Sequence, residues 1–550
     1  MTVGDVYLKP NVLIEPLYNQ WYAWPNLIPP ATAAMYVANQ HLKIMQSFVS
    51  APQVHVSALK NPAMQGGPFL NYDASRVPAI RELIDRTARN HRQMVEFAEA
   101  VQTFDQVLAD ESQGYSLEPL YKRVPDILKG YVELVYDLNN RASMRFMEGL
   151  LYRSRFYNPK SQSVAISLVE NDSGRSFVFS TPRLKNDLHL HLDVPFNHQG
   201  LQELFRMKEM PREYGWIKEA LGVSDDDDAL FSTFFTEEES PPPASYDGDG
   251  VRVRYFGHAC VLIETRHTSI LTDPVISYPF PGASDRYTLA DLPANIDYVL
   301  ITHSHQDHCL FESLLALRHR IRNLIVPKNN SGFIADPSLR LVLQQIGFNQ
   351  VREVEEMETI EVDGGYFMAV PFLGEHGDLN VRSKNAYLMK LNGKSLYFAA
   401  DSNNLETALY DHLHEVSGDL DVLFIGMECE GAPMSWLYGP LATKPLLRKM
   451  DQERRLDGSD SAKALQIVDR LRPREVYIYA MGQEPWLTFL TSIKYTPKSR
   501  PIVESDKLVA ECRNRGLVAE RLFGHKELLL EAAVEPQKIS VAYQGMSAWN

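Results

Sequence analysis

A histidine- and aspartate-rich motif, H-x-H-x-D-H, follows directly after an apolar run at residues 296–301. The run has the length and composition of a buried β-strand. Side chains two positions apart at a strand end share a face, so His303 and His305 can bind one cation. Where the chain turns into a helix, Asp307 and His308 are directed toward a second cation beside the first. The motif therefore predicts a binuclear metal site.

The types of donor atom limit the metal. Imidazole nitrogens and carboxylate oxygens suit zinc, iron or manganese, whereas a soft thiolate site needs cysteine ligands. The chain has four cysteines, which lie far apart and form no C-x-x-C pair. This pattern argues against a disulfide framework and against a zinc ribbon. A histidine-rich surface loop is the alternative interpretation of the motif, but the apolar strand before it disfavours a surface loop.

The overall composition is typical of a soluble globular protein, since 45% of the 550 residues are hydrophobic and 23% are charged. No run of about 18 apolar residues occurs, so we expect no membrane span. The first residues lack the basic and apolar regions of a signal peptide, and we expect a cytoplasmic protein. The formal net charge of -15 opposes non-specific binding to nucleic acid, which requires a basic face.

One change in composition divides the chain. Residues 225–250 combine acidic runs, a triple proline and paired glycines, which are typical of an extended linker. We therefore expect an N-terminal α+β domain at residues 1–224, a metal-binding domain at residues 251–535 and a tail at residues 536–550. Since the N-terminal domain shows no catalytic spacing, we expect it to serve dimerisation or docking.

Secondary structure is expected to differ between the two domains. In the N-terminal domain, apolar residues at helical spacing predict helices within residues 78–110 and 118–153, and shorter β-like segments follow at residues 163–168 and 175–179. In the second domain, short apolar segments alternate with helical stretches, and the predicted strands are residues 251–256, 259–264, 269–273, 395–400, 421–425 and 475–479. Two sheets with helices outside, and a site at the strand ends, is the arrangement that this order favours.

Several ordered motifs resemble the metallo-β-lactamase fold superfamily over residues 250–535. The segments G-H-A-C-V-L-I-E and I-L-T-D-P look like the opening β-hairpin of that superfamily, whose aspartate, here Asp273, braces the metal loop. The resemblance also implies a structural role for His258. Asp401, after a predicted strand, matches the bridging aspartate that touches both metals. The resemblance implies an αββα fold for this domain.

Two departures from the superfamily pattern concern its hydrolases. Where these usually supply a third histidine to the first metal, this chain reads F-L-G-E-H-G-D, so Glu375 and His376 compete for that role. The strand that commonly delivers a last histidine to the second metal is followed by A-M-G and has no histidine. The second metal is thus left with an open position, because a surface location is the more ordinary interpretation of His525.

These departures resemble a rarer branch, the di-iron β-hydroxylases of the chloramphenicol-pathway type, in which a glutamate replaces the third histidine. Carried over residue by residue, the resemblance implies one iron on His303, His305 and Glu375, a second iron on Asp307 and His308, and Asp401 as the bridge. An added carboxylate agrees with iron, because hard oxygen donors stabilise its ferric state, whereas zinc has no redox chemistry.

The same resemblance implies an activity and its partners. Such enzymes insert one oxygen atom from O₂, their co-substrate, at the β-carbon of an amino acid. The amino acid is held as a thioester on the carrier domain of a nonribosomal peptide synthetase, and an electron donor reduces the two iron ions. A homodimer is a further expectation. Neither nucleic acid nor a membrane is expected as a partner.

A loop after the predicted strand at residues 421–425 adds candidate residues. Glu430 leaves that strand at the same sheet edge and is a candidate catalytic or gating carboxylate beside Glu375. Trp436 and Tyr438 either line an aromatic side-chain pocket or belong to the core.

Two other functions remain as alternatives. A Zn²⁺-dependent hydrolase of phosphodiesters or lactones would use a zinc-activated water, with His376 as third ligand and Asp307 assisting. A docking module with a degenerate metal domain is the weakest interpretation, because the chain retains the whole H-x-H-x-D-H motif together with Asp401.

Overall fold

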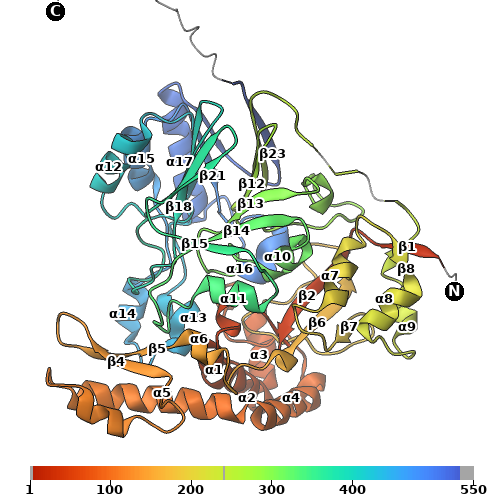
Figure 1. Cartoon of the computed structure of the whole chain (residues 1–550), viewed down its shortest axis with the longest axis vertical. Helices are drawn as coiled ribbons and strands as arrows, with labels where there is room; N and C mark the ends of the chain where they lie inside the picture. The colour runs from red at the N-terminus through yellow and green to blue at the C-terminus, as the bar shows by residue number, and fades with distance from the viewer. Residues whose placement is uncertain (1–3, 240–241, 244, 533–550) are drawn as a thin grey trace, which may run out of the picture.

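Two seven-stranded sheets form the centre of the second half of the chain in the computed structural model, which describes residues 4–239, 242–243 and 245–532 (Figure 1). The first sheet contains, in spatial order, β15 (Val351–Val354), β14 (Ile321–Pro327), β13 (Ile296–Leu300), β12 (Ser269–Thr272), β11 (Cys260–Glu264), β10 (Val251–Gly257) and β23 (Lys526–Leu530). The second contains β16 (Thr359–Val362), β17 (Gly365–Val370), β18 (Ala386–Leu391), β19 (Lys394–Phe398), β20 (Val422–Gly426), β21 (Glu475–Tyr479) and β22 (Val518–Arg521). The strands from β12 to β15 are parallel to one another, and so are those from β19 to β22, which brings their carboxyl ends to common edges.

Apolar side chains hold these sheets face to face. Val253 of the first sheet shares a buried cluster with Phe367 and Phe424 of the second. The outer face of the second sheet packs against α12 (Ala408–Ser417), α15 (Ser461–Leu471) and α17 (Arg500–Asn514), and the first sheet packs against α10 (Phe311–Leu317) and α11 (Leu339–Gln345). The result is the αββα arrangement expected from the sequence, and the seven strands predicted between residues 251 and 479 lie close to their predicted positions.

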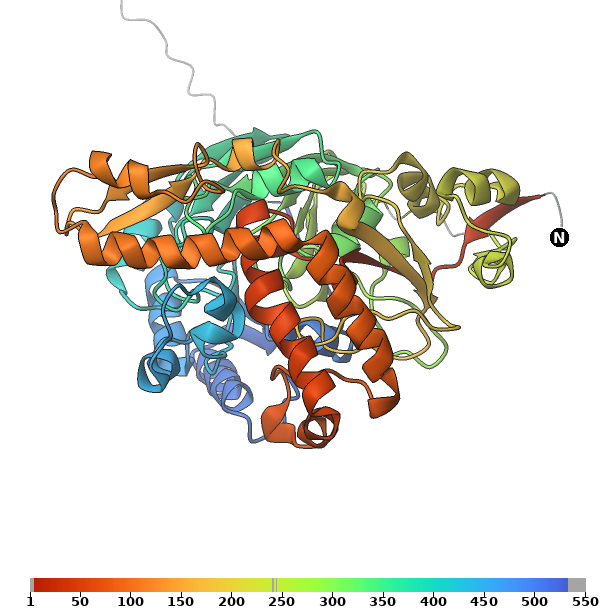
Figure 2. The same cartoon turned by 90° about the horizontal axis from the view of Figure 1, so that it is seen from below.

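The N-terminal half is α+β, as predicted. Its helices include α1 (Pro30–Tyr36), the π-helix η2 (Val37–His41), α2 (Leu42–Ser50), α3 (Pro52–Leu59), α4 (Val77–Asn90) and α5 (Arg92–Glu111). Its larger sheet has the order β3 (Trp21–Tyr22), β2 (Val12–Tyr18), β6 (Gln162–Leu168) and β7 (Leu190–Leu192). Helix α5 and the hairpin of β4 (Val132–Tyr136) and β5 (Ala142–Phe146) extend to one side of the molecule (Figure 2).

Three sequence predictions for the N-terminal half were wrong. Residues 118–153 form mainly the β4–β5 hairpin, because Val132 and Leu134 alternate in burial with their neighbours and Asn140 turns the chain at positive φ. Residues 175–179 form no strand. The expected linker begins later than residue 225, since α9 (Asp228–Ser232) and β9 (Phe235–Thr236) fold back onto the domain and β9 pairs with β1 (Asp5–Leu8). The predicted tail at 536–550 lies outside the described residues.

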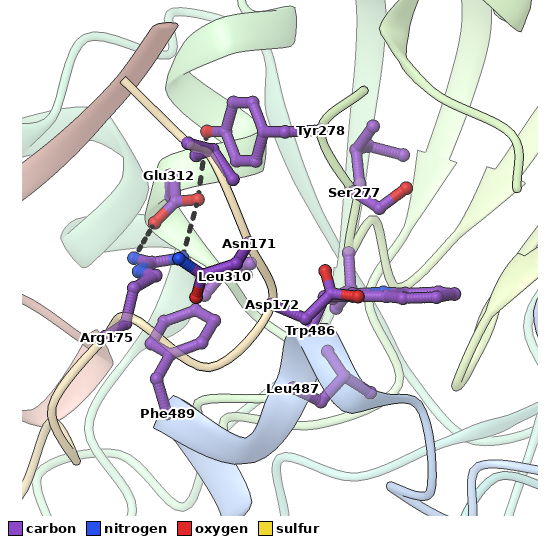
Figure 3. A pocket seen from close by; sticks show the side chains of 13 residues that line it. Asn171, Asp172, Arg175, Ser277, Tyr278, Leu310, Glu312, Trp486, Leu487 and Phe489 are labelled. Atoms are coloured by element: carbon purple, nitrogen blue, oxygen red, sulfur yellow. Dashed lines mark hydrogen bonds and ion pairs between the residues drawn. The ribbon is translucent and has the colours of Figure 1, made fainter. Parts of the chain in front are cut away.

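The two halves share one hydrophobic core and a buried network of charges. In this network Glu15 of β2 accepts hydrogen bonds from Arg175 and Arg183 of the N-terminal half. Arg175 also donates to Glu312 of α10, and the hydroxyl of Tyr278 donates to the same carboxylate (Figure 3). The cavity beside these groups measures about 20 Å³, which is room for a single water. The charged side chains of this network therefore pair with one another and leave no room for a ligand.

Within the described residues, no helix is both long and apolar enough to cross a membrane.

Candidate metal centre

Asp273, which follows β12, holds the loop after β13 in place through hydrogen bonds. Asp273 is fully buried and accepts hydrogen bonds from the backbone N–H of Thr302 (2.7 Å), from the Thr302 hydroxyl (2.6 Å) and from Nδ1 of His308 (2.8 Å). Its backbone has a positive φ of 34°, a strained conformation for an aspartate. Asp273 thus fixes the start and the end of the H-x-H-x-D-H loop, as its resemblance to the bracing aspartate implied.

These contacts also decide which nitrogen of each histidine is free. The Thr302 hydroxyl gives its proton to Asp273 and therefore accepts from Nδ1 of His303, at 2.9 Å. Nδ1 of His308 donates to Asp273, and Nε2 of His305 lies 2.9 Å from the hydroxyl of Tyr438. A neutral imidazole that donates through one nitrogen keeps a lone pair on the other. Nε2 of His303 and Nε2 of His308 are therefore the nitrogens that point away from these hydrogen bonds, and His305 directs its Nδ1 toward Glu375, 2.8 Å away.

Glu375 reaches these histidines from a strained turn after β17. Gly374 has a φ of 83° and Glu375 a φ of 70°, a region that favours glycine. The ammonium of Lys384 holds the turn by donating to the Gly374 carbonyl at 3.1 Å. A Cβ on residue 374 would overlap Asn403, so only glycine fits there. As a result, Oε1 of Glu375 lies 2.8 Å from Nδ1 of His305.

Asp401 follows β19 and lies between two histidines. Its Oδ2 is 3.0 Å from Nε2 of His308 and 3.9 Å from Nε2 of His303. Ala400 before it has a positive φ of 50°, which turns the chain sharply at the strand end. This is the location that a bridging carboxylate requires.

The donor atoms form overlapping groups of a size that suits metal ions. Within each group the ligand atoms lie within 4.8 Å of one another, and the groups are His303, His305 and Glu375; His303, His308 and Asp401; and His258, Asp307 and His308. Several of these atoms are buried without a hydrogen-bond partner, namely Nε2 of His303, Nε2 of His308, Oε2 of Glu375 and Oδ1 of Asp401. Buried polar atoms without partners are costly, and nitrogen and carboxylate oxygen donors suit iron ions. The residues present therefore fit two iron ions.

His258 joins the third group as a donor rather than as a ligand. Its Nδ1 accepts the backbone N–H of Gly482 at 3.2 Å, so its proton must be on Nε2. That nitrogen lies 3.4 Å from Oδ2 of Asp307. Burial alone would raise the pKa of Asp307, but His258 and His308 lower it well below the usual value. His258 thus keeps Asp307 ionised, in agreement with a structural role.

Glu375 is electrostatically different from Asp307. Burial raises the pKa of Glu375 to about 7, although His305 partly offsets this effect. His376 is fully buried beside it, with Nδ1 3.1 Å from Oε2 of Glu375, and burial lowers the pKa of its ring well below the usual value. Among the described residues, Glu375 belongs to a metal-sized group and His376 does not.

The candidate role of Glu430 is not supported by its position. Its side chain is exposed, because the loop after β20 turns it outward. Glu428, two residues earlier, is the carboxylate that interacts with the centre: burial first, and then Asp401 and Asp307, raise its pKa well above the usual value. The alternation of side chains between the two faces of β20 ends with the strand. The sequence therefore gives no signal for which of the two glutamates in the following loop points inward.

The two aromatic candidates, Trp436 and Tyr438, lie in different surroundings. Tyr438 is buried against His305, at the end of the short helix α13 (Met434–Tyr438). Trp436 of the same helix lines a cavity of about 600 Å³ between the two halves, together with Phe177 and Phe179. His525 is exposed and lies near the carbonyl of Asp285, consistent with a surface residue.

Comparisons with known proteins agree with this geometry. The profile of the "Diiron non-heme beta-hydroxylase N-terminal domain" family matches residues 7–239, and that of the "Beta-lactamase superfamily domain" matches residues 252–440. A 4-amino-L-phenylalanyl-[CmlP-peptidyl-carrier-protein] 3-hydroxylase from Streptomyces venezuelae is 40% identical over 530 residues, covering 95% of this chain and 99% of the relative.

Solved structures give the same result. The crystal structure of CmlA, a diiron β-hydroxylase from Streptomyces venezuelae, has a TM-score of 0.90 and 39% identity, and the match covers 96% of this chain and all of that chain. A CmlA mutant has a TM-score of 0.88 at the same identity and coverage of this chain. These matches favour the oxygenase prediction over the zinc hydrolase, and two iron ions are the cofactor of the family. The chain belongs to the diiron non-heme β-hydroxylase family.

Proposed function

We propose that this protein hydroxylates the β-carbon of an aminoacyl group held as a thioester on a peptidyl carrier protein. The observation that carries the proposal is Glu375, which stands with His303 and His305 where hydrolases of the superfamily use a third histidine. The S. venezuelae relative acts on a carrier-bound aminoacyl group, and the similarity extends over nearly the whole of both chains.

The proposed ligand set uses the groups of free donor atoms. His303, His305 and Glu375 would hold the first iron, Asp307 and His308 would hold the second, and Asp401 would be shared between them. The orientation that Asp273 gives to His308, together with the buried atoms that lack partners, supports this assignment. Three carboxylates against two divalent ions leave one positive charge. This excess favours an additional anionic ligand at the open position of the second metal.

The chemistry divides between the irons and the chain. When bound, the two iron ions supply the redox chemistry by which O₂, two electrons and two protons convert a C–H bond to C–OH with release of one water. His258 keeps Asp307 ionised by directing its Nε2–H at the carboxylate. Burial, followed by the carboxylates of Asp401 and Asp307, raises the pKa of Glu428 well above its usual value. Tyr438 and Phe372, both buried, exclude water from the first-metal side.

The partners follow from the reaction. A carrier protein presents the substrate, and an electron donor supplies two electrons per turnover. The N-terminal domain supplies the docking or dimer surface: the side chains of Tyr115, which follows α5, and Leu138, in the turn of the β4–β5 hairpin, are exposed. A homodimer in the cytoplasm is the assembly that we propose.

The test compares a carrier protein loaded with amino acids, including 4-amino-L-phenylalanine, with the same amino acids free in solution. With matched reductant and O₂, we expect hydroxylated product from the loaded carrier at a rate at least tenfold higher. Equal rates with the free amino acid would refute a carrier-bound substrate. Hydrolysis of phosphodiesters or lactones by zinc-loaded protein, without hydroxylation, would refute the proposed reaction.

A further inference from the structure

The short helix α13 and the 3₁₀ turn after it, η8 (Gly439–Leu441), lie between the N-terminal domain and the metal centre. Three hydrogen bonds attach this segment to the N-terminal domain. They join the Tyr36 hydroxyl to the Leu437 carbonyl (2.6 Å), the Asn39 amide to the Pro440 carbonyl (2.9 Å) and the Trp436 indole N–H to the Gly66 carbonyl (2.9 Å).

The segment depends on these bonds for its position. A helix of five residues is too short to be stable by itself. One side of α13 faces the cavity of about 600 Å³ through Pro433, Ser435 and Trp436, so a packed core does not support it there. Helix α14 (Arg448–Glu453) also holds α13, because the Asp451 carboxylate accepts hydrogen bonds from the backbone N–H and the hydroxyl of Ser435. The N-terminal domain and α14 therefore fix the position of α13 together.

The last residue of α13 contacts a proposed metal ligand. The hydroxyl of Tyr438, 3% exposed, lies 2.9 Å from Nε2 of His305. On the other side of the same ring, Nδ1 lies 2.8 Å from Oε1 of Glu375. A ring whose proton is on Nε2 presents its lone pair at Nδ1, toward the first metal position, and the opposite tautomer does not. Phenylalanine would fill the same space without fixing the tautomer.

We propose that Tyr438 is a positioning residue for His305, and that the N-terminal domain acts on the first metal site through α13. The proposal rests on the ligand set proposed above. Tyr438 accepts the Nε2–H of His305 and fixes the ring plane, and the bonds from Tyr36 and Asn39 fix Tyr438. A fully folded N-terminal domain is then a requirement for tight metal binding in a domain that holds every ligand.

The test measures metal affinity in the full chain, without substrate. Under anaerobic conditions, Fe²⁺ is titrated into metal-free protein against a chelator of known affinity. Tyr438→Phe should lower the affinity of one of the two sites at least tenfold, the scale on which outer contacts of metal ligands act, and leave the other within twofold. Tyr36→Phe should lower the affinity of the same site by at least twofold.

Tyr72→Phe is the matched control, because its hydroxyl also donates to a carbonyl, that of Pro182 at 2.7 Å, within the N-terminal domain. It should change neither affinity by as much as twofold. If Tyr438→Phe does not fold, the half-buried Asn39→Ala variant carries the test, with at least a threefold loss at one site. Unchanged affinities in Tyr438→Phe, Tyr36→Phe and Asn39→Ala, or an equal loss in Tyr72→Phe, would overturn the proposal. Because the titration contains no substrate, its result does not depend on whether the protein hydroxylates a carrier-bound amino acid.

Discussion

Two buried glutamates, one in each half of the molecule, have opposite electrostatic surroundings. Burial alone would raise the pKa of Glu15, but Arg183 and Arg175 lower it to about 2. Burial, assisted by the carboxylate of Asp401, raises the pKa of Glu375 to about 7, and His305 and His308 offset this only in part. The first glutamate has its cations within the protein. The second has no arginine or lysine partner of this kind: His305 contacts only its Oε1, at 2.8 Å, and its Oε2 has no hydrogen-bond partner. Burial alone therefore does not distinguish a structural charge network from a metal site. The charged partners of each buried carboxylate do.

The largest expected effect tests the structural side of this comparison. Glu15→Gln leaves two buried guanidinium groups without their shared carboxylate, which should lower the free energy of unfolding by about 3–5 kcal/mol. Iron content per folded chain should stay unchanged. Chemical denaturation and metal analysis measure the two quantities. Glu96→Gln is the control, since its pair with Arg92 is exposed and should cost less than about 1 kcal/mol. Loss of iron in proportion to loss of stability would show that the two regions are not distinct.

The next prediction changes the metal side. Glu375→His restores the hydrolase ligand set and removes a negative charge from the first metal site, so hydroxylation should fall at least about tenfold and zinc should be preferred over iron. His376→Ala should leave iron content nearly unchanged, because no donor group includes His376. Metal analysis and single-turnover assays measure both variants. The ligand assignment would be reversed if His376→Ala removed the metal while Glu375→His kept full activity.

These residues also show what the sequence could establish. The metal motif was predictable because its residues are adjacent and follow a buried strand, and the fold followed from the order of strands and helices. The orientation of Glu430, whose exposed position does not support its candidate role, could not be predicted, because a loop does not preserve the alternation of a strand. The partners of Asp273 and Tyr438 come from distant segments, and so do those of Glu15, which pairs with residues 160 and 168 positions away. Contacts of that kind leave no local pattern.

The smallest expected effect is a difference in pH dependence without metal. The pKa of Glu375 in the folded protein is raised above its unfolded value, so this group favours folding most below pH 4.5 and that contribution is lost as pH rises toward 7. The pKa of Glu15 is lowered, so its contribution is present above pH 4.5 and is lost as pH falls toward 2. Thermal unfolding of metal-free protein should be less pH-dependent between pH 5 and about 7 in Glu375→Gln than in the parent. An identical profile would contradict the raised pKa.

Metal content measured together with the optical spectrum tests the central claim most directly. Protein produced with iron available should contain about two iron ions per chain, and its oxidised form should absorb light through its iron. Reduction should bleach that absorbance, and a loaded carrier with O₂ should restore it with formation of product. Stoichiometric zinc, without iron-dependent absorbance, would contradict the assignment of His303, His305, Asp307, His308, Glu375 and Asp401 to a di-iron centre.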